Sequence, residues 1–132
     1  MTVGDDESTR PVVALHRANT ILYCRRWDAT VAFYRDALRL PITHSTDWFI
    51  EFRLTDGAYL SVADASRATI ADVEGQGITL SWRVADVSAA RRRLIDRGLT
   101  PSDERSVWGA TVCYLTDPEG HRIELWTDDS PQ

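Results

Sequence analysis

Side chains that could carry chemistry are few in this sequence, and they are scattered along it. Histidine occurs at His16, His44 and His121, and cysteine occurs at Cys24 and Cys113 without a C-x-x-C pair. All 15 basic residues are arginine, which excludes Schiff-base chemistry on lysine and a P-loop lysine. No nucleophile elbow supports covalent catalysis, and two cysteines are too few for a zinc knuckle. We therefore expect the histidines to lie at the surface or at strand edges, and the cysteines to be small buried apolar groups.

The composition is that of a soluble globular protein with one compact domain. Of the 132 residues, 43% are hydrophobic and 27% are charged. The net charge of -5 argues against nucleic-acid binding, which needs a basic surface, and it favours neutral or cationic ligands. No apolar run approaches the roughly 20 residues of a membrane span, so no membrane partner is expected. The acidic start of the chain lacks the features of a signal peptide, and we expect a cytoplasmic protein with reduced thiols.

The elements that must position these side chains occur twice in the same order. Strand-like runs surround two helical segments, WDATVAFYRDALRL and VSAARRRLIDR, whose starts lie about 60 residues apart. Asp28 and Asp86 are the expected N-caps of these helices, and Gly98 is expected at the end of the second helix. The sequences TDG and DPEG predict a hairpin turn and a type I turn. The segment 98–110 has no regular pattern and is compatible with a loop over a ligand-binding face.

This repeat divides the chain into four parts. They are a flexible tail at 1–16, a first βαβββ module at 17–64, a linker at 65–76 and a second βαβββ module at 77–128. The pattern predicts an α+β protein in which each module has one helix to cover one face of its sheet. The other face must meet the partner module, a second chain or a ligand.

Two segments of the sequence resemble a known family. NTILYCRRWDATVAFYRDALRL resembles the opening of the glyoxalase / bleomycin-resistance protein / dioxygenase family, the vicinal oxygen chelate superfamily, and TDPEGHRIELW resembles its closing hairpin. The resemblance covers roughly residues 17 to 128 as a single glyoxalase-like domain. It implies two βαβββ modules that form an eight-stranded, cup-shaped mixed sheet with the helices on the outer face. It also implies a dimer and a ligand in the cup.

The resemblance carries four metal-ligand positions onto this chain. Metal-dependent members place His, Gln or Glu there, whereas this sequence has Asn19, Ser61, Thr79 and Glu124. Alcohols have little affinity for divalent transition metals, and a catalytic metal site needs about three good protein ligands. We therefore expect no metal and no other cofactor, with a divalent metal on atypical ligands as the alternative. Glu124 could instead anchor a ligand, act as a general base, or be a cavity carboxylate paired with Arg83 or Arg122.

Alternation along the strands from these four positions predicts which side chains point into the cup. Three aromatic rings among them would suit a flat, drug-sized molecule, since ring stacking adds to the energy of burial. The side chains expected to bind a ligand are Asn19, Tyr23, Tyr59, Ser61, Thr79, Arg83, Arg122, Glu124 and Trp126, with Trp48 and Trp108 at the rim.

The sequence supports three hypotheses about function. The first is a binding protein for a small aromatic or cationic molecule, such as an antibiotic, which would confer antibiotic resistance. The second is a lyase, isomerase or dioxygenase of the same superfamily, either metal-dependent through atypical ligands or metal-free with Glu124 as the catalytic base. The third is a scaffold without a small ligand. The exposed edges of the expected sheets, together with the resemblance, predict a homodimer.

Overall fold

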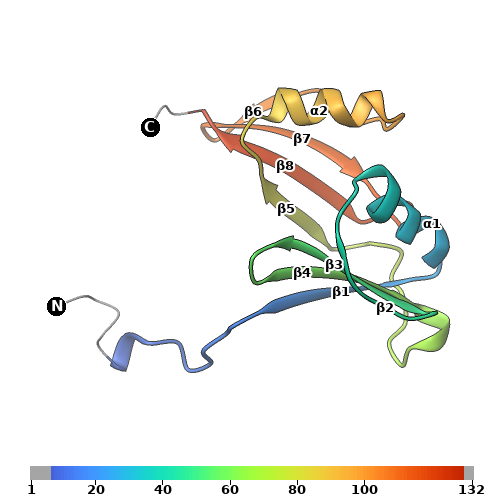
Figure 1. The fold of residues 1–132 in the computed structure, drawn as a ribbon. Helices are drawn as coiled ribbons and strands as arrows, with labels where there is room; N and C mark the ends of the chain where they lie inside the picture. Colours follow the sequence, from blue (N-terminus) through green and yellow to red (C-terminus); the bar gives the residue numbers. More distant parts are fainter. Residues whose placement is uncertain (1–6, 130–132) are drawn as a thin grey trace.

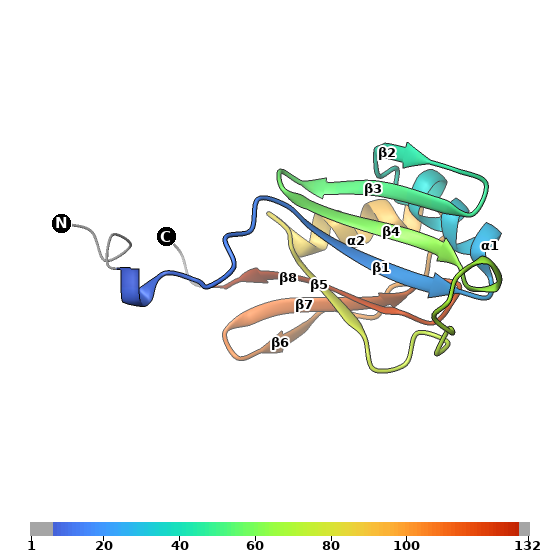
Figure 2. The same ribbon diagram turned by 90° about the horizontal axis from the view of Figure 1, so that it is seen from below.

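The computed structural model describes residues 7–129 of the chain (Figure 1). The fold begins with a short 3-10 helix, η2 (Glu7–Thr9), and an extended segment that leads into the first sheet. Eight strands and two α-helices follow, and the strands form two sheets of four. Both termini of the described chain lie on the same side of the molecule in both views (Figures 1 and 2).

The first sheet has the strand order β1-β4-β3-β2. Its strands are β1 (Ala18–Cys24), β2 (Ile42–Ser45), β3 (Phe49–Thr55) and β4 (Ala58–Asp64). β1 pairs with β4 in parallel, and the other neighbours are antiparallel. The predicted TDG hairpin joins β3 to β4, and Gly57 adopts the left-handed φ of 79° that a tight turn needs.

The second sheet repeats this order as β5-β8-β7-β6. Its strands are β5 (Thr79–Arg83), β6 (Arg105–Val107), β7 (Ala110–Thr116) and β8 (Arg122–Asp128), and a 3-10 turn, η4 (Ala65–Arg67), opens the connection between the sheets. The segment 98–110 is regular only in part, because it contains the three-residue strand β6, which pairs with β7 at the edge of the sheet. Within the described residues no ladder joins β1 to β5, so the eight strands form two separate sheets.

The first helix differs from the sequence prediction at both ends. It begins at Trp27, with Arg26 rather than Asp28 at the N-cap position, and α1 (Trp27–Ala32) continues as a π-helical turn, η3 (Phe33–Ala37). The Arg26 backbone N–H donates to the Glu119 carboxylate at 2.8 Å. A side chain distant in sequence, rather than a neighbouring one, therefore provides the acceptor at the start of the helix. The second helix, α2 (Val87–Asp96), has the predicted cap, since Asp86 accepts from the Ala89 N–H at 3.0 Å.

Each helix packs on the sheet of its own module, and both helices lie on the same side of the molecule. Figure 2 shows the strands of both sheets spread in front of the helices. α1 contacts β1 and β4, and α2 contacts β7 and β8. The strand residues that pack under the helices include Leu22, Cys24, Leu60, Val62, Cys113, Leu115, Ile123 and Leu125. Both cysteines are buried as predicted. This arrangement confirms the predicted α+β fold, with the helices on one face and an opposite face free of helix.

The two modules meet at one end of the molecule, where the β7–β8 turn packs against α1 and η3. The Tyr34 hydroxyl, which is fully buried, donates to Asp117 Oδ2 at 2.7 Å. His121 lies 2.8 Å from the same carboxylate oxygen and is 1% exposed, so the prediction of a surface histidine is wrong here. Burial alone would raise the pKa of the Asp117 carboxyl, but hydrogen bonds from His121 and Tyr34 outweigh burial and hold the pKa below its usual range.

Two glycines allow the connection between the sheets to reach this junction. Gly75 has a φ of 75°, and a Cβ atom built on it would lie 2.3 Å from the carbonyl carbon of Gly120 in the β7–β8 turn. Such an approach is open only to glycine, because any side chain would collide with backbone. The connection between the sheets and the turn therefore pack backbone against backbone. No helix among residues 7–129 is long and apolar enough to cross a membrane.

Candidate functional site

The helix-free face of the first sheet holds five of the residues that the sequence singled out. Strand register places Asn19 beside Tyr59, Ile21 beside Ser61, and Tyr23 beside Ala63, all on the face opposite the core. β3 adds a third column, in which Glu51 pairs with Ser61 and Phe49 pairs with Ala63. Trp48 immediately precedes β3. The face therefore has a polar end near Asn19 and an apolar end near Tyr23.

The polar end is organised by Glu51, which the sequence analysis missed. Glu51 is only 9% exposed, and its carboxylate accepts hydrogen bonds from Arg17 at 2.6 Å and from Thr43 at 2.7 Å. These two hydrogen bonds, that of Arg17 above all, hold the pKa of Glu51 below its usual value. The Arg17 guanidinium also lies 3.6 Å from the centre of the Tyr59 ring. Alternation within FIEFR, with Ile50 and Phe52 in the core, is the sequence signal that would have pointed to Glu51.

The apolar end is a cavity of about 320 Å³. Its walls come from three strands and from the start of the connection between the sheets, and they comprise Ile21, Tyr23, Trp48, Phe49, Ala63, Arg67, Ala68 and Thr69. The Trp48 and Phe49 rings are 5.6 Å apart in an edge arrangement, which is a favourable contact between aromatic groups. The structure thus brings the predicted Tyr23 and Trp48 into one hollow whose size is at the lower end of small-molecule pockets.

The helix-free face of the second sheet holds the remaining strand residues. Glu124 is half-buried and accepts a hydrogen bond from Ser81 at 2.6 Å, while Arg122 donates to Thr79 Oγ1 at 3.0 Å. Arg83 pairs with Asp128 at 3.1 Å. Among the described residues Glu124 has no ion pair with either arginine, so the alternative in which it pairs with Arg83 or Arg122 is wrong, and Ser81 is its partner instead.

The aromatic residues of this second face differ in their surroundings. Trp126 is half-buried, and the Arg83 guanidinium lies 5.7 Å from the centre of its ring. Tyr114, which the sequence analysis did not select, lies beside Glu124 in the register, with the Arg122 guanidinium 4.8 Å from its ring centre. Trp108 is at the tip of the β6–β7 hairpin and is 99% exposed. A further hollow of about 430 Å³ lies between β5 and the β3–β4 hairpin, and Arg83 is one of the residues that line it.

Comparison with known proteins identifies the family. The family model described as the Glyoxalase/Bleomycin resistance protein/Dioxygenase superfamily matches residues 15–125 of the chain. The chain belongs to this superfamily. A search of curated proteins found no significant match.

Three solved structures share the fold of this chain at low sequence identity. A glyoxalase/bleomycin resistance protein/dioxygenase from Nocardioides has a TM-score of 0.77 and 20% identity, covering 95% of this chain and 91% of its own. A lactoylglutathione lyase from Agrobacterium tumefaciens has a TM-score of 0.70 and 20% identity, covering 89% of this chain and 94% of its own. TnmS3, an antibiotic binding protein from Streptomyces sp. CB03234, has a TM-score of 0.73 and 17% identity, covering 90% of this chain and 99% of its own.

The donor set at the four positions that the resemblance carried over as metal-ligand positions does not fit a divalent transition metal. Ser61 Oγ donates to the Asn19 side-chain oxygen at 2.9 Å, so these two groups already satisfy each other. Thr79 accepts from a guanidinium, which places a positive charge where a cation would have to sit. Only Glu124 offers a carboxylate, and residues 7–129 contain no group of three or more metal-type side chains.

Proposed function

We propose that the protein binds a small aromatic molecule, such as an antibiotic or an aromatic metabolite, on its helix-free face and without a metal ion. The observation that carries this proposal is the hollow in which Tyr23 and Trp48 come together beside Ala63. Two aromatic side chains at the edge of a small apolar cavity provide surfaces on which a flat ring can stack.

The polar end of the same face gives the bound molecule an orientation. On this face Asn19 and Tyr59 lie one register position from Ile21 of the cavity, and the fully buried Ser61 holds the Asn19 side chain. The Glu51 charge is balanced by Arg17. A neutral ring with a hydrogen-bonding substituent therefore matches the first sheet. A cationic substituent matches the second sheet, where Glu124 has a hydroxyl partner and no arginine partner among the described residues. TnmS3, which is described as an antibiotic binding protein, has the same fold and supports a binding role for this architecture.

A binding screen with matched variants tests this proposal. Fluorescence and calorimetric titration against a panel of aromatic antibiotics and metabolites should find a ligand whose affinity falls about tenfold in Tyr23→Ala and in Trp48→Ala, because loss of one stacking ring costs roughly 1.4 kcal/mol. Ile95→Ala is the control, since Ile95 is an exposed apolar side chain on α2, on the helix side. The proposal fails if no compound binds, or if both aromatic variants bind as tightly as the wild type.

Metal analysis tests the metal-free part of the proposal separately. Purified protein dialysed without chelator should hold far less than one zinc, nickel, manganese or iron ion per chain. Near-stoichiometric metal that is lost in Glu124→Ala would overturn it and would favour a metal-dependent enzyme.

A second candidate function is metal-free chemistry with Glu124 as general base. The observation that favours it is the half-buried position of this carboxylate, 2.6 Å from the Ser81 hydroxyl. If a bound compound is turned over, Glu124→Gln should abolish turnover and leave the affinity within a few-fold of the wild type. Turnover that persists in Glu124→Gln would eliminate this role.

We further propose that the protein works as a cytoplasmic homodimer. β1 and β5 each pair on one side only within the described chain, and all four residues of β2 are exposed at the other edge of the first sheet. Uncovered strand edges favour pairing or packing with a second copy. Light scattering at micromolar concentration should give twice the 14.9 kDa chain mass. A monomer mass at that concentration would contradict the proposal.

A further inference from the structure

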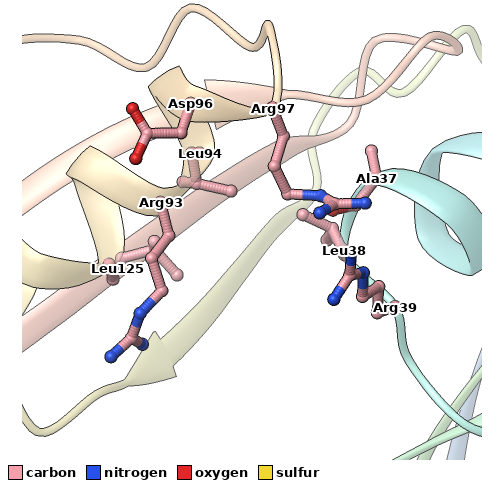
Figure 3. A pocket seen from close by; sticks show the side chains of 9 residues that line it. Ala37, Leu38, Arg39, Arg93, Leu94, Asp96, Arg97 and Leu125 are labelled. Carbon is pink, nitrogen blue, oxygen red and sulfur yellow. The ribbon is translucent and has the colours of Figure 1, made fainter.

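Another cavity lies on the opposite side of the molecule, among the helices. It has a volume of about 460 Å³ and lies between the end of η3 and α2 (Figure 3). Its apolar wall consists of Ala37, Leu38, Ala90, Leu94 and Leu125. Leu125 belongs to the core face of β8, so this cavity and the Tyr23 hollow lie on opposite faces of the sheets.

Three arginines surround this apolar wall. Arg97 is fixed, since its guanidinium donates to the carbonyl oxygens of Asp36 and Ala37, each at 2.7 Å. Arg39 and Arg93 also line the cavity, and neither guanidinium has a hydrogen bond or an ion pair with another residue between 7 and 129. Figure 3 shows them on two sides of the opening, and it shows the Asp96 carboxylate pointing away from the guanidinium groups. The cavity therefore combines an apolar wall with uncompensated positive charge.

Arg39 has a backbone conformation that is unusual for an arginine. Arg39 has a φ of 58°, in the left-handed region that favours glycine, at the turn where the chain leaves η3. Hydrogen bonds from the Leu38 and Leu40 N–H groups back to η3 fix this turn. A glycine would satisfy the turn without strain, whereas the arginine adds a cation at the mouth of the cavity.

We propose that this cavity binds a small amphipathic anion, in which a carboxylate is attached to an aliphatic body. Guanidinium groups recognise carboxylates through paired N–H donors, and Arg39 and Arg93 have all of theirs available. The aliphatic body packs against Leu38, Leu94 and Leu125. The protein as a whole carries a net charge of -5, so this local positive charge is not a general property of its surface.

Calorimetric titration of the full chain with decanoate, below its micelle concentration, tests this site. Decanoate should bind at least tenfold more tightly than decanol, which lacks the charge, and than acetate, which lacks the aliphatic body. Decyltrimethylammonium should not bind. Equal affinity for decanoate and decanol would overturn the proposal, because it would show that the arginines contribute nothing.

Variants decide where decanoate binds. Arg39→Gln and Arg93→Gln should each weaken decanoate binding several-fold, and the double variant should bind decanoate no better than decanol. Arg92→Gln is the matched control, since Arg92 is exposed on the same helix and does not line the cavity. An equal effect of Arg92→Gln would point to a nonspecific charge effect and refute the site. Loss of decanoate binding in Tyr23→Ala would place the ligand on the other face and would also refute it.

Discussion

The buried hydrogen bond between Tyr34 and Asp117 offers the sharpest test of how the two modules are joined. Tyr34→Phe removes only the hydroxyl that donates to Asp117 Oδ2 at 2.7 Å, and it keeps the ring that packs in the core. The carboxylate retains His121 and the backbone N–H groups of the turn as partners. The change therefore isolates a single contact between the first module and the second.

The expected cost follows from the charge of the acceptor. A hydrogen bond to an ionised group contributes roughly 1.5–3 kcal/mol, and the remaining partners of Asp117 favour the lower part of that range. We expect Tyr34→Phe to reduce the free energy of unfolding by about 2 kcal/mol in urea titrations at pH 7. Tyr23→Phe is the control, because the Tyr23 hydroxyl has no hydrogen-bond partner in the described chain, and its effect should stay within about 0.5 kcal/mol.

The effect should also depend on pH. The pKa of Asp117 is lowered in the folded protein, so its ionised form stabilises the fold above the pKa of about 3.9 that an unfolded aspartate has. This stabilisation is lost as the pH falls through the lower folded pKa. The difference between the wild type and Tyr34→Phe should therefore be full at pH 6 and shrink below pH ~4. A variant as stable as the wild type at pH 7, or a difference unchanged at low pH, would refute the reasoning.

Three further predictions concern single sites. Gly75→Ala should reduce the free energy of unfolding by more than about 2 kcal/mol in urea titrations. Gly77→Ala is the control, because Gly77 has the same left-handed backbone but open space around it, and it should cost only about 1 kcal/mol of backbone strain. Similar losses in both variants would mean that the close approach to the β7–β8 turn does not matter. Glu51→Gln should lower the urea midpoint of unfolding at pH 7, and the midpoint should approach that of the wild type in acid. The reason is that the pKa of Glu51 is lowered in the folded protein, so its contribution to stability disappears as the pH falls. A midpoint difference independent of pH would count against the ion pair of Glu51. Burial raises the pKa of Cys24 to about 12 and also raises the pKa of Cys113. Neither thiol should therefore react with a disulfide reagent at pH 8 until the protein is unfolded. Rapid labelling of the native protein would show that the thiols are accessible.

Features set by neighbours in sequence were predictable. The TDG hairpin, the Asp86 cap and the turn that begins at Asp117 depend on side chains a few residues apart, and all three occur in the structure. The resemblance to the superfamily placed Asn19 and Ser61 on one face, and they do lie on one face in the structure. Alternation then extended each position along its own strand, because the side-chain period of a strand needs no tertiary information.

Features set by distant partners were not predictable from local patterns. Asp28 has the residue type of a cap, but the start of α1 is satisfied by Glu119 from the other module. A histidine after a turn is commonly exposed, yet His121 is buried because Asp117 provides a charged partner for its ring. Glu51 was the exception, since alternation within β3 would have shown which face it occupies.

The hydrogen bonds between the modules are gathered at one end, around Tyr34, Arg26 and Arg97. The β3–β4 and β6–β7 hairpins lie at the other end (Figure 1). A small tilt of one sheet relative to the other about the hydrogen-bonded end would therefore displace the hairpin tips more than any residue near that end. A donor and acceptor dye pair attached at Asp56 and Trp108, at the tips of the two hairpins, would register such tilting as a change in energy transfer.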